Sequence, residues 1–328
     1  MSEITNNAPS KQEKKLEKKN AALAKKLSRR GTKIKETLGD RVLLGFTTVV
    51  LVFVMIIVGY PVLYVISSSF SSNDALSAGR VVLFPIEPSM ASYKYVFQFD
   101  ELWQGYKMTI FYTIFGTTIT MIAQILCAYP LSRPKYQGRG GIMAVFFITT
   151  MVGAGMVPTL IVRSAMGLRD NVWAVLLAGV LSVHNMIILR TSFRSSIPGE
   201  LYDAAAIDGA NDFQTLFKIA LPLTKATLSV LTLYSAVGNW NEYFTSMIYL
   251  PQRKDLWPLQ LVLRDIMSGK QSLEETPIST GQVAAMMNNG SEGRTFAIIV
   301  LTTVPVLLMY FVVQKYFEKG VMVGSVKG

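Results

Sequence analysis

The sequence predicts an all-α integral membrane protein with about six transmembrane helices and with both termini in the cytoplasm. Three observations predict this fold class. The 328 residues are 51% hydrophobic and only 16% charged, which is too apolar for a water-soluble domain of this size. Apolar residues gather in windows of ~20 residues with almost no charge, the length of helix that crosses ~30 Å of hydrocarbon. Most Lys and Arg residues lie in the two terminal segments and in the loops that alternate windows place on the same side, as cytoplasmic segments require.

The N-terminal segment 1–40 is predicted to be a basic cytoplasmic leader. Twelve Lys or Arg residues lie between Lys11 and Arg41, directly before the first apolar window. Such a run attracts anionic lipid head groups and holds a segment in the cytoplasm; a solvated basic helix without a specific partner is the alternative. The net charge of +11 therefore does not indicate a nucleic-acid partner. The leader is too long for the charged region of a signal peptide, so the first window is expected to remain as an anchor.

The membrane domain is predicted to occupy residues 41–328. Its third window contains Gly153, Gly155 and Pro158, which favours a broken or closely packed helix. A polar segment, 251–295, separates the last two windows; it is too long for a simple turn and is predicted to be extracytoplasmic. The predicted spans cover residues 42–66, 106–131, 142–161, 172–189, 223–250 and 296–313.

The chain has one cysteine, Cys127, and one histidine, His184, both inside apolar windows. A disulfide or cysteine-based metal site within the chain is therefore excluded, and one His without Cys argues against most zinc chemistry. We expect Cys127 to pack as a small hydrophobic residue and His184 to be a hydrogen-bonded interior residue. No metal or cofactor is expected in this chain.

The most specific pattern lies in the predicted cytoplasmic loop 195–222, within SSIPGELYDAAAIDGANDFQTLFKIALPLTKA. A proline and the acids Glu200 and Asp203 indicate a helix start, because acids complement the helix dipole there. Three alanines follow, Gly209 is a natural stop, and Asn211 can cap a second helix. Pro222 is expected to break this second helix where the chain turns back into the bilayer. A short helix with a smooth alanine face suits a groove of another protein better than bond chemistry. A surface-lying helical hairpin without a partner is the alternative.

The same loop resembles the EAA motif of binding-protein-dependent ABC importer permeases, in which E-A-A is followed by D-G-A, then F and I, then L-P. The likeness extends over about 43–328, includes the runs MVPTLIV and GNWNEYFTSMIYL, and is closest to sugar permeases of the maltose-permease type, carbohydrate uptake family 1. Asp203 stands where the motif has Glu, with the same charge and a shorter reach, and Ala226 where proline is common. The matching residues are Asp203, Ala204, Ala205, Asp208, Gly209, Ala210, Phe213, Ile219, Leu221 and Pro222.

This resemblance implies a type I ABC importer permease fold in the bacterial plasma membrane and a chain that is not itself an enzyme. No G-x-x-x-x-G-K-[ST] sequence occurs in the chain, so ATP and Mg²⁺ would belong to two cytoplasmic ATPase subunits. A second, related permease, an extracytoplasmic sugar-binding protein that delivers an oligosaccharide, and membrane lipids are the other implied partners. The residues implied in ATPase coupling, with 200–209 as the coupling helix, are Glu200, Leu201, Asp203, Ala204, Ala205, Asp208, Gly209, Ala210, Phe213 and Pro222.

The fifth window contains a dense group of polar and aromatic residues. Polar side chains within spans are costly and usually face a bundle interior or a water-filled path. Amides, a carboxylate and aromatic faces together suit a hydroxyl-rich solute; packing against a partner span or a place at the outer interface is the alternative. The candidate residues of a substrate pathway are Asn239, Trp240, Asn241, Glu242 and Tyr243.

Two other function classes compete with the importer. A membrane-embedded enzyme would need convergent titratable groups within the spans, whereas the sequence offers one histidine and scattered acids such as Glu242. A passive channel or an ion-coupled carrier would transport without ATP, and carriers often show related halves, which the sequence does not display. Either class would leave the helix-turn-helix loop unexplained.

Overall fold

The structure, a computed structural model, describes residues 37–267 and 291–325, and these are helical, with no β-strand among them. Most of the predicted leader 1–40 and the middle of the predicted loop 251–295 lie outside the described residues. The chain divides into two compact units, 1–61 and 62–328. The division falls inside the first described helix, α2 (Leu38–Ser69).

The described part of the first unit is the beginning of α2. The Thr37 N–H donates to Asp40 Oδ2 at 2.9 Å and the Asp40 N–H donates to Thr37 Oγ1 at 3.2 Å. This reciprocal cap starts the helix, and its hydrogen bonds lower the pKa of the Asp40 carboxyl. The most apolar stretch of α2 has no buried residue, as expected of a helix that faces lipid. The predicted helix over 42–66 is confirmed.

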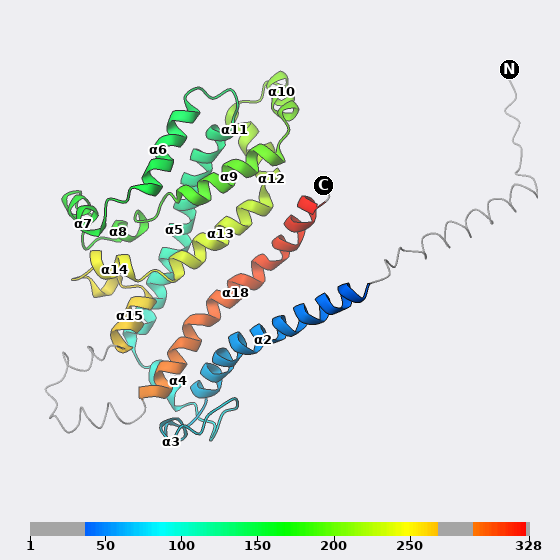
Figure 1. Cartoon of the computed structure of the whole chain (residues 1–328). Coiled ribbons are helices and arrows are strands. Elements are labelled where there is room, and N and C mark those ends of the chain that lie inside the picture. The colour runs from blue at the N-terminus through cyan, green and yellow to red at the C-terminus, as the bar shows by residue number, and fades with distance from the viewer. Residues whose placement is uncertain (1–36, 268–290, 326–328) are drawn as a thin grey trace, which may run out of the picture. The chain divides into compact units, whose positions relative to one another are not determined.

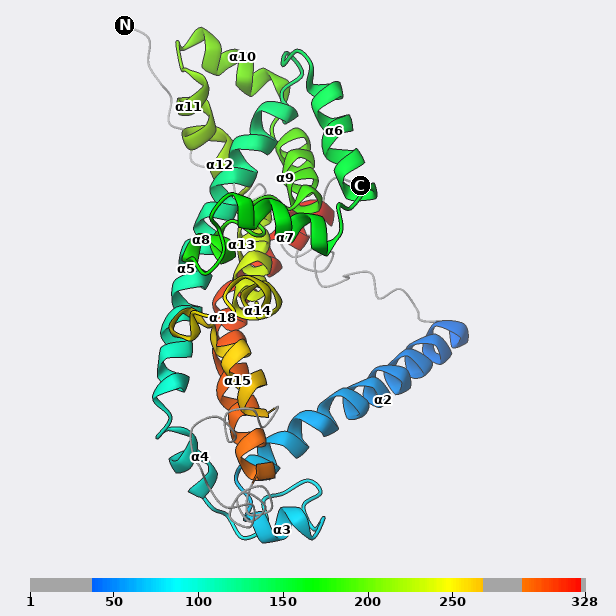
Figure 2. The ribbon, with the colours of Figure 1, turned by 90° about the vertical axis from the view of Figure 1, so that its left-hand side faces the viewer.

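The second unit is built around α5 (Asp100–Ser132). This helix packs against α9 (Val183–Ser196) and α13 (Lys225–Trp240), and α13 in turn packs against α18 (Ser291–Ser325). Figures 1 and 2 show α13 running between α5 and α18. The predicted helices over 106–131 and 296–313 are therefore confirmed as parts of α5 and α18.

Glycines on α5 allow other helices to approach it closely. A Cβ atom on Gly116 would lie 3.1 Å from the side-chain atoms of Asn239 on α13, and one on Gly105 would lie 3.1 Å from the Cα of Leu259. Leu259 begins the short helix α15, whose apolar side is buried in the bundle. Neither approach leaves room for a larger residue without a shift of the neighbour.

Several of the shorter elements lie at the two ends of this bundle. Figures 1 and 2 show α10, α11 and α12 together at one end, and α3 and α4 at the other. The shorter elements are α3 (Asn73–Ser77), α4 (Ala91–Val96), α6 (Arg139–Met151), α7 (Met156–Ala165), α8 (Val172–Leu176), α10 (Gly199–Ile207), α11 (Asp212–Thr215), a π-helical turn (Leu216–Ala220), α12 (Leu221–Leu223), α14 (Phe244–Tyr249), a 3₁₀ turn (Lys254–Leu256) and α15 (Leu259–Met267).

Three of the described helices are long and apolar enough to cross a membrane: α2, α5 and the part of α18 over 293–311. Two bent pairs raise this number to five if each pair is one span. Helices α6 and α7 meet at 117°, and residues 212–223 meet α13 at 85°. The third window is thus a broken helix, and Gly155, with φ +78°, lies at the start of its second half. Six spans and cytoplasmic termini stay predictions.

The fourth and fifth predicted spans are not continuous helices. Within 172–189, α8 ends at Leu176 and α9 begins at Val183, where the Ser182 hydroxyl accepts a hydrogen bond from the Asn185 N–H. Within 223–250, residues 241–243 separate α13 from α14. Apolar composition predicts burial or lipid exposure but does not reveal a capping side chain that starts a new helix.

The single cysteine and histidine differ in their surroundings. Cys127 is half-buried and packs against the apolar cluster where α5 meets α9, as predicted. The expectation that His184 is an interior residue is wrong, because its side chain, in the first turn of α9, is exposed. An apolar window places a residue in a helix but does not decide which face of the helix it occupies.

Candidate functional site

The loop between α9 and α13 folds as the predicted helix, turn and helix. Its first helix, α10, ends at Ile207 and is followed by Asp208 and by Gly209, whose φ is +73°. The Gly209 N–H donates to the Ala206 carbonyl at 3.2 Å, and the Ala210 N–H donates to the Ala205 carbonyl at 2.9 Å. These two bonds form a Schellman motif, which requires the left-handed backbone that glycine adopts without strain. The predicted stop at Gly209 is confirmed.

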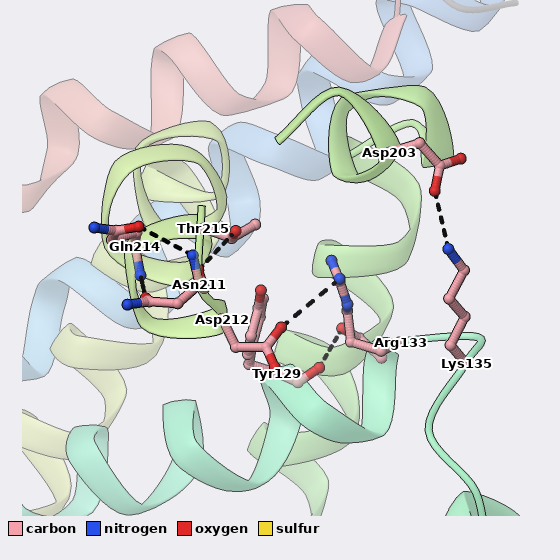
Figure 3. Close-up of polar contacts among 9 residues, drawn as sticks. Tyr129, Arg133, Lys135, Asp203, Asn211, Asp212, Gln214 and Thr215 are labelled. Atoms are coloured by element: carbon pink, nitrogen blue, oxygen red, sulfur yellow. Dashed lines mark hydrogen bonds and ion pairs between the residues drawn. The ribbon is translucent and has the colours of Figure 1, made fainter. Parts of the chain in front are cut away.

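The second helix begins at a full capping box. The Gln214 N–H donates to Asn211 Oδ1 at 2.8 Å, and the Asn211 N–H donates to Gln214 Oε1 at 3.0 Å (Figure 3). The predicted cap at Asn211 is confirmed.

The prediction that Pro222 breaks this helix is wrong. A π-helical turn, in which the Leu221 N–H donates to the Leu216 carbonyl, precedes Pro222. This wider turn makes room for the proline ring, which would clash with the preceding turn of a regular α-helix. The chain bends only at Thr224.

Three side-chain contacts fasten this loop to the end of α5, and Figure 3 shows those of Arg133 with Asp212 and of Lys135 with Asp203. The guanidinium of Arg133 lies 3.7 Å from the ring centre of Tyr202, and its Nη2 lies 3.9 Å from Asp212 Oδ1. Lys135 Nζ donates to Asp203 Oδ1 at 3.0 Å. Burial raises the pKa of the Tyr202 hydroxyl, which therefore stays neutral. Because the Lys135–Asp203 pair is exposed, it stabilises little, whereas Arg133 is largely shielded and its stacking on Tyr202 stabilises more.

Helix α10 presents one face to the protein and the other to the surroundings. Ala205 is buried and Tyr202 half-buried, so they mark the inner face. On the opposite side Ala204 is exposed, and Ile207 is 86% exposed, so this side offers a large apolar side chain that a partner can cover. We call this side, with the exposed acids next to it, the outer face of α10. Those acids are Glu200, Asp203 and Asp208.

Most of the residues implied in coupling by resemblance lie at the surface of this loop. Ala205 is the exception, because it packs inward, and Ala210 is half-buried. Sequence reasoning missed Ile207, although its position three residues after Ala204 places it on the same face of a helix. It also missed Arg133, whose contact with Tyr202 joins distant parts of the chain. The exposed residues are Glu200, Leu201, Asp203, Ala204, Asp208, Gly209, Phe213 and Pro222.

A second site is a cleft of about 350 Å³ where α5, α8, α9, α13 and α14 meet. Of the five candidate pathway residues, Asn239 and Glu242 line it. The Asn239 Nδ2 donates to Thr117 Oγ1 at 3.2 Å, and Glu242 Oε1 accepts from the Thr245 N–H at 2.5 Å. The lining residues are Thr120, Gln124, Val175, Ala178, Gly179, Ser182, Asn185, Ser235, Gly238, Asn239, Glu242 and Thr245.

The other three candidate pathway residues do not line this cleft. Trp240 is buried, and its Nε1–H donates to the Thr302 carbonyl of α18 at 3.2 Å. Asn241 and Tyr243 are exposed, and the Tyr243 ring lies under the guanidinium of Arg264. Adjacent residues at the end of a helix point in different directions. Residues that are neighbours in the sequence are therefore divided here among the cleft, the contact with α18 and the surface.

A comparison with known protein families identifies the family of this chain. Residues 108–323 match the family described as "Binding-protein-dependent transport system inner membrane component". The chain belongs to this family. The family consists of ABC transporter permease subunits, which are not catalytic, and the permease is accordingly a multi-pass membrane protein.

Two relatives and one solved structure show how far the likeness of this permease extends. It is 35% identical over 301 residues to the polygalacturonan/rhamnogalacturonan transport system permease protein YtcP of Bacillus subtilis (strain 168), covering 90% of the permease and 100% of the relative. It is 33% identical over 268 residues to Protein LplC of the same organism, covering 82% and 89%. A chain in the crystal structure of a bacterial ABC transporter involved in the import of the acidic polysaccharide alginate matches with a TM-score of 0.76 and 34% identity, covering 86% and 98%.

Proposed function

We propose that this permease translocates an oligosaccharide that an extracytoplasmic binding protein delivers, and that a separate cytoplasmic ATPase drives the step. The family supports an importer that uses a binding protein. The names of similar permeases support the substrate class, since they include polygalacturonan and rhamnogalacturonan, arabinooligosaccharides and galactooligosaccharides.

The outer face of α10 is the single observation on which ATPase coupling rests. Ile207 protrudes beside the small Ala204, and acids lie around them. This pattern suits a cleft that has an apolar floor for Ile207 and basic residues at its rim. In this proposal, the coupling residues Glu200 and Asp203 meet that rim, and Ile207 is the anchor.

The fastening of α10 explains how force would reach the membrane. The Schellman motif, the capping box and the Arg133–Tyr202 stack join the loop to the end of α5. The second half of the loop leads through Leu216 and Ala220, both buried in the same apolar cluster as α5 and α9, into α13. A displacement of α10 would therefore move α5 and α13 as rigid elements, and these helices line the polar cleft.

The proposed assembly contains more than one such chain. One permease presents one α10, whereas closure of a pair of ATPase subunits acts on two coupling helices. We therefore place a second, related permease, two ATPase subunits with ATP and Mg²⁺, and the sugar-binding protein beside this chain. Asn239 and Glu242 are proposed to contact the solute on its way through.

Uptake by the whole assembly in lipid vesicles tests this function. The two labelled probes are galactotriose and trigalacturonate. We expect ATP-dependent uptake of at least one. Ile207→Ser should weaken binding of the ATPase subunit by about 10- to 100-fold, because burying an isoleucine side chain contributes about 1.5–3 kcal/mol. Ser195→Ala, at an exposed position in the last turn of α9, is the control and should bind the ATPase normally.

Two results would contradict the proposal. Uptake without ATP would favour a channel or an ion-coupled carrier. Full ATPase binding and full uptake by Ile207→Ser would show that the outer face of α10 is not the coupling surface.

A further inference from the structure

A cleft of about 530 Å³, here called the basic cleft, lies where the end of α5 meets α11 and the π-helical turn. Helix α5 is long and apolar enough to cross a membrane, so the cleft at its end lies near the depth at which hydrocarbon gives way to head groups. Leu126 and Phe213 are large apolar side chains that stay exposed here. The apolar residues of the lining are Leu126, Pro130, Phe213 and Leu216.

An exposed apolar face of α5 leads to the basic cleft. Phe115, Ile122 and Leu126 are exposed, and their spacing along the chain places them on one side of the helix. Leu126, the last of this row, also lines the cleft. A hydrocarbon chain that lies along this face therefore brings whatever it is attached to into the cleft.

The charged part of the lining is basic on balance. Arg133 and Lys135 line the basic cleft, and Asp212 is the one carboxylate among the described residues that do so. Arg133 Nη2 lies 3.9 Å from Asp212 Oδ1, which is too long for a hydrogen bond, so the guanidinium keeps N–H donors for another anion. The Lys135 side chain is 85% exposed, and its flexible ammonium group can exchange Asp203 for another anion at little cost.

Three further arginines raise the positive potential at this end of α5. Arg139 Nη1 donates to the Arg133 carbonyl at 3.2 Å, and Arg190 Nε donates to the Leu131 carbonyl at 2.9 Å, so both cations complement the negative end of the helix dipole. Arg190 also lies close enough to Arg139 and Arg194 to be repelled by their positive charges. An anion bound at this end is therefore stabilised by several cations at once.

We infer that the basic cleft binds an anionic phospholipid, with its phosphate at Arg133 and Lys135 and one acyl chain along the exposed apolar face of α5. Apolar side chains within the span and cations directly after it follow the order of chain and phosphate in such a lipid. Basic pockets at the ends of membrane helices suit anionic lipid head groups for this reason. The site depends on the membrane location of the permease and not on the sugar that it carries.

Titration of the purified assembly in detergent with dioleoylphosphatidylglycerol and dioleoylphosphatidylcholine tests the inference, with bound lipid measured by native mass spectrometry. We expect the anionic phosphatidylglycerol to bind more tightly. Lys135→Ala should weaken its binding about fivefold, or ~1 kcal/mol, the contribution of one basic residue near a membrane surface, and should leave phosphatidylcholine binding unchanged. Asp212→Asn removes the one carboxylate of the described lining and should strengthen phosphatidylglycerol binding about 2- to 5-fold. Lys218→Ala is the matched control, because Lys218 is exposed in the π-helical turn and does not line the cleft.

Leu126→Ala tests the apolar half of the site and should weaken the binding of both lipids about 3- to 10-fold, because it removes apolar contact and no charge. Equal binding of the two lipids, or equal effects of Lys135→Ala and Lys218→Ala, would overturn the site. If glycerol 1-phosphate, which has no acyl chain, displaces phosphatidylglycerol at similar concentrations, the cleft binds free anions and the lipid assignment is wrong. If the permease alone binds phosphatidylglycerol but the complete assembly does not, a partner subunit covers the cleft and the inference fails. Binding is measured without transport, so a failure here leaves the proposed function untouched.

Discussion

A graded series of substitutions at Gly209 tests whether the shape of the turn after α10 couples ATP hydrolysis to transport. The residue has φ +73°, and a Cβ atom added to it would meet no heavy atom within 4 Å. A substitution there is therefore strained by backbone conformation alone and does not clash with a neighbour. Different residues placed at position 209 therefore differ in stability mainly through how well each tolerates the left-handed backbone conformation.

The expected costs follow from the backbone. Asparagine visits the left-handed region readily, so Gly209→Asn should cost well under ~1 kcal/mol. Alanine should cost about 1–2 kcal/mol. Proline is fixed near φ −65° and removes the N–H that donates to the Ala206 carbonyl, so it should cost about 3 kcal/mol or more. The Schellman motif should thus persist with Asn, loosen with Ala and be lost with Pro.

The assay is the ratio of sugar taken up to ATP hydrolysed by the reconstituted assembly. We expect this ratio to be near normal for Gly209→Asn, lower for Gly209→Ala and close to zero for Gly209→Pro, with insertion of the permease into the membrane unchanged in all three. If Gly209→Pro transports as well as the wild type, or if Asn and Pro are equally impaired, the backbone geometry of this turn does not transmit force.

Two further substitutions test the packing of α5. Gly116→Ala should lower the stability of the assembly by about 1–3 kcal/mol, because its Cβ would press on Asn239 at 3.1 Å. Gly45→Ala, where a Cβ meets nothing within 4 Å, should be neutral or slightly stabilising in thermal unfolding. Arg133→Lys should cost about 0.5–2 kcal/mol and lower the uptake-to-ATP ratio, because an ammonium group does not stack on the Tyr202 ring as a flat guanidinium does.

The neighbouring ion pair supplies the control for Arg133. Lys135 and Asp203 are both exposed, so Lys135→Ala should change the stability by at most ~1 kcal/mol. Equal effects of Arg133→Lys and Lys135→Ala would show that general positive charge, and not stacking on Tyr202, fastens α10 to α5.

The coupling loop was largely predictable because its signals are local. A left-handed C-terminus at Gly209 and an Asn211 cap are each determined by residues within about four positions in the chain. The exposed position of Ile207 follows from the same helical spacing, once the inner face is known. Pro222 misled the prediction, because the π-helical turn that accommodates it is a rearrangement of the preceding backbone and not a property of proline itself.

The polar cleft was only partly predictable because its residues come from three separate windows. Asn239 and Glu242 stood out as polar residues in an apolar segment, but so did Trp240, which packs against α18 instead. Gln124 left a weak signal, a polar stripe on one face of α5, that has no meaning until α9 and α13 are placed against that face.

The sequence by itself determined the membrane character, the helical class, the family and the helix-turn-helix loop, since composition and short-range hydrogen bonding decide all of these. The tertiary structure decided which helices are interrupted, which residues of a polar cluster share a cleft, and that Arg133 fastens α10 to α5. These depend on close approaches such as that of Gly116 to Asn239, which join residues far apart in the chain. No local pattern specifies such a contact, because it exists only when whole helices pack.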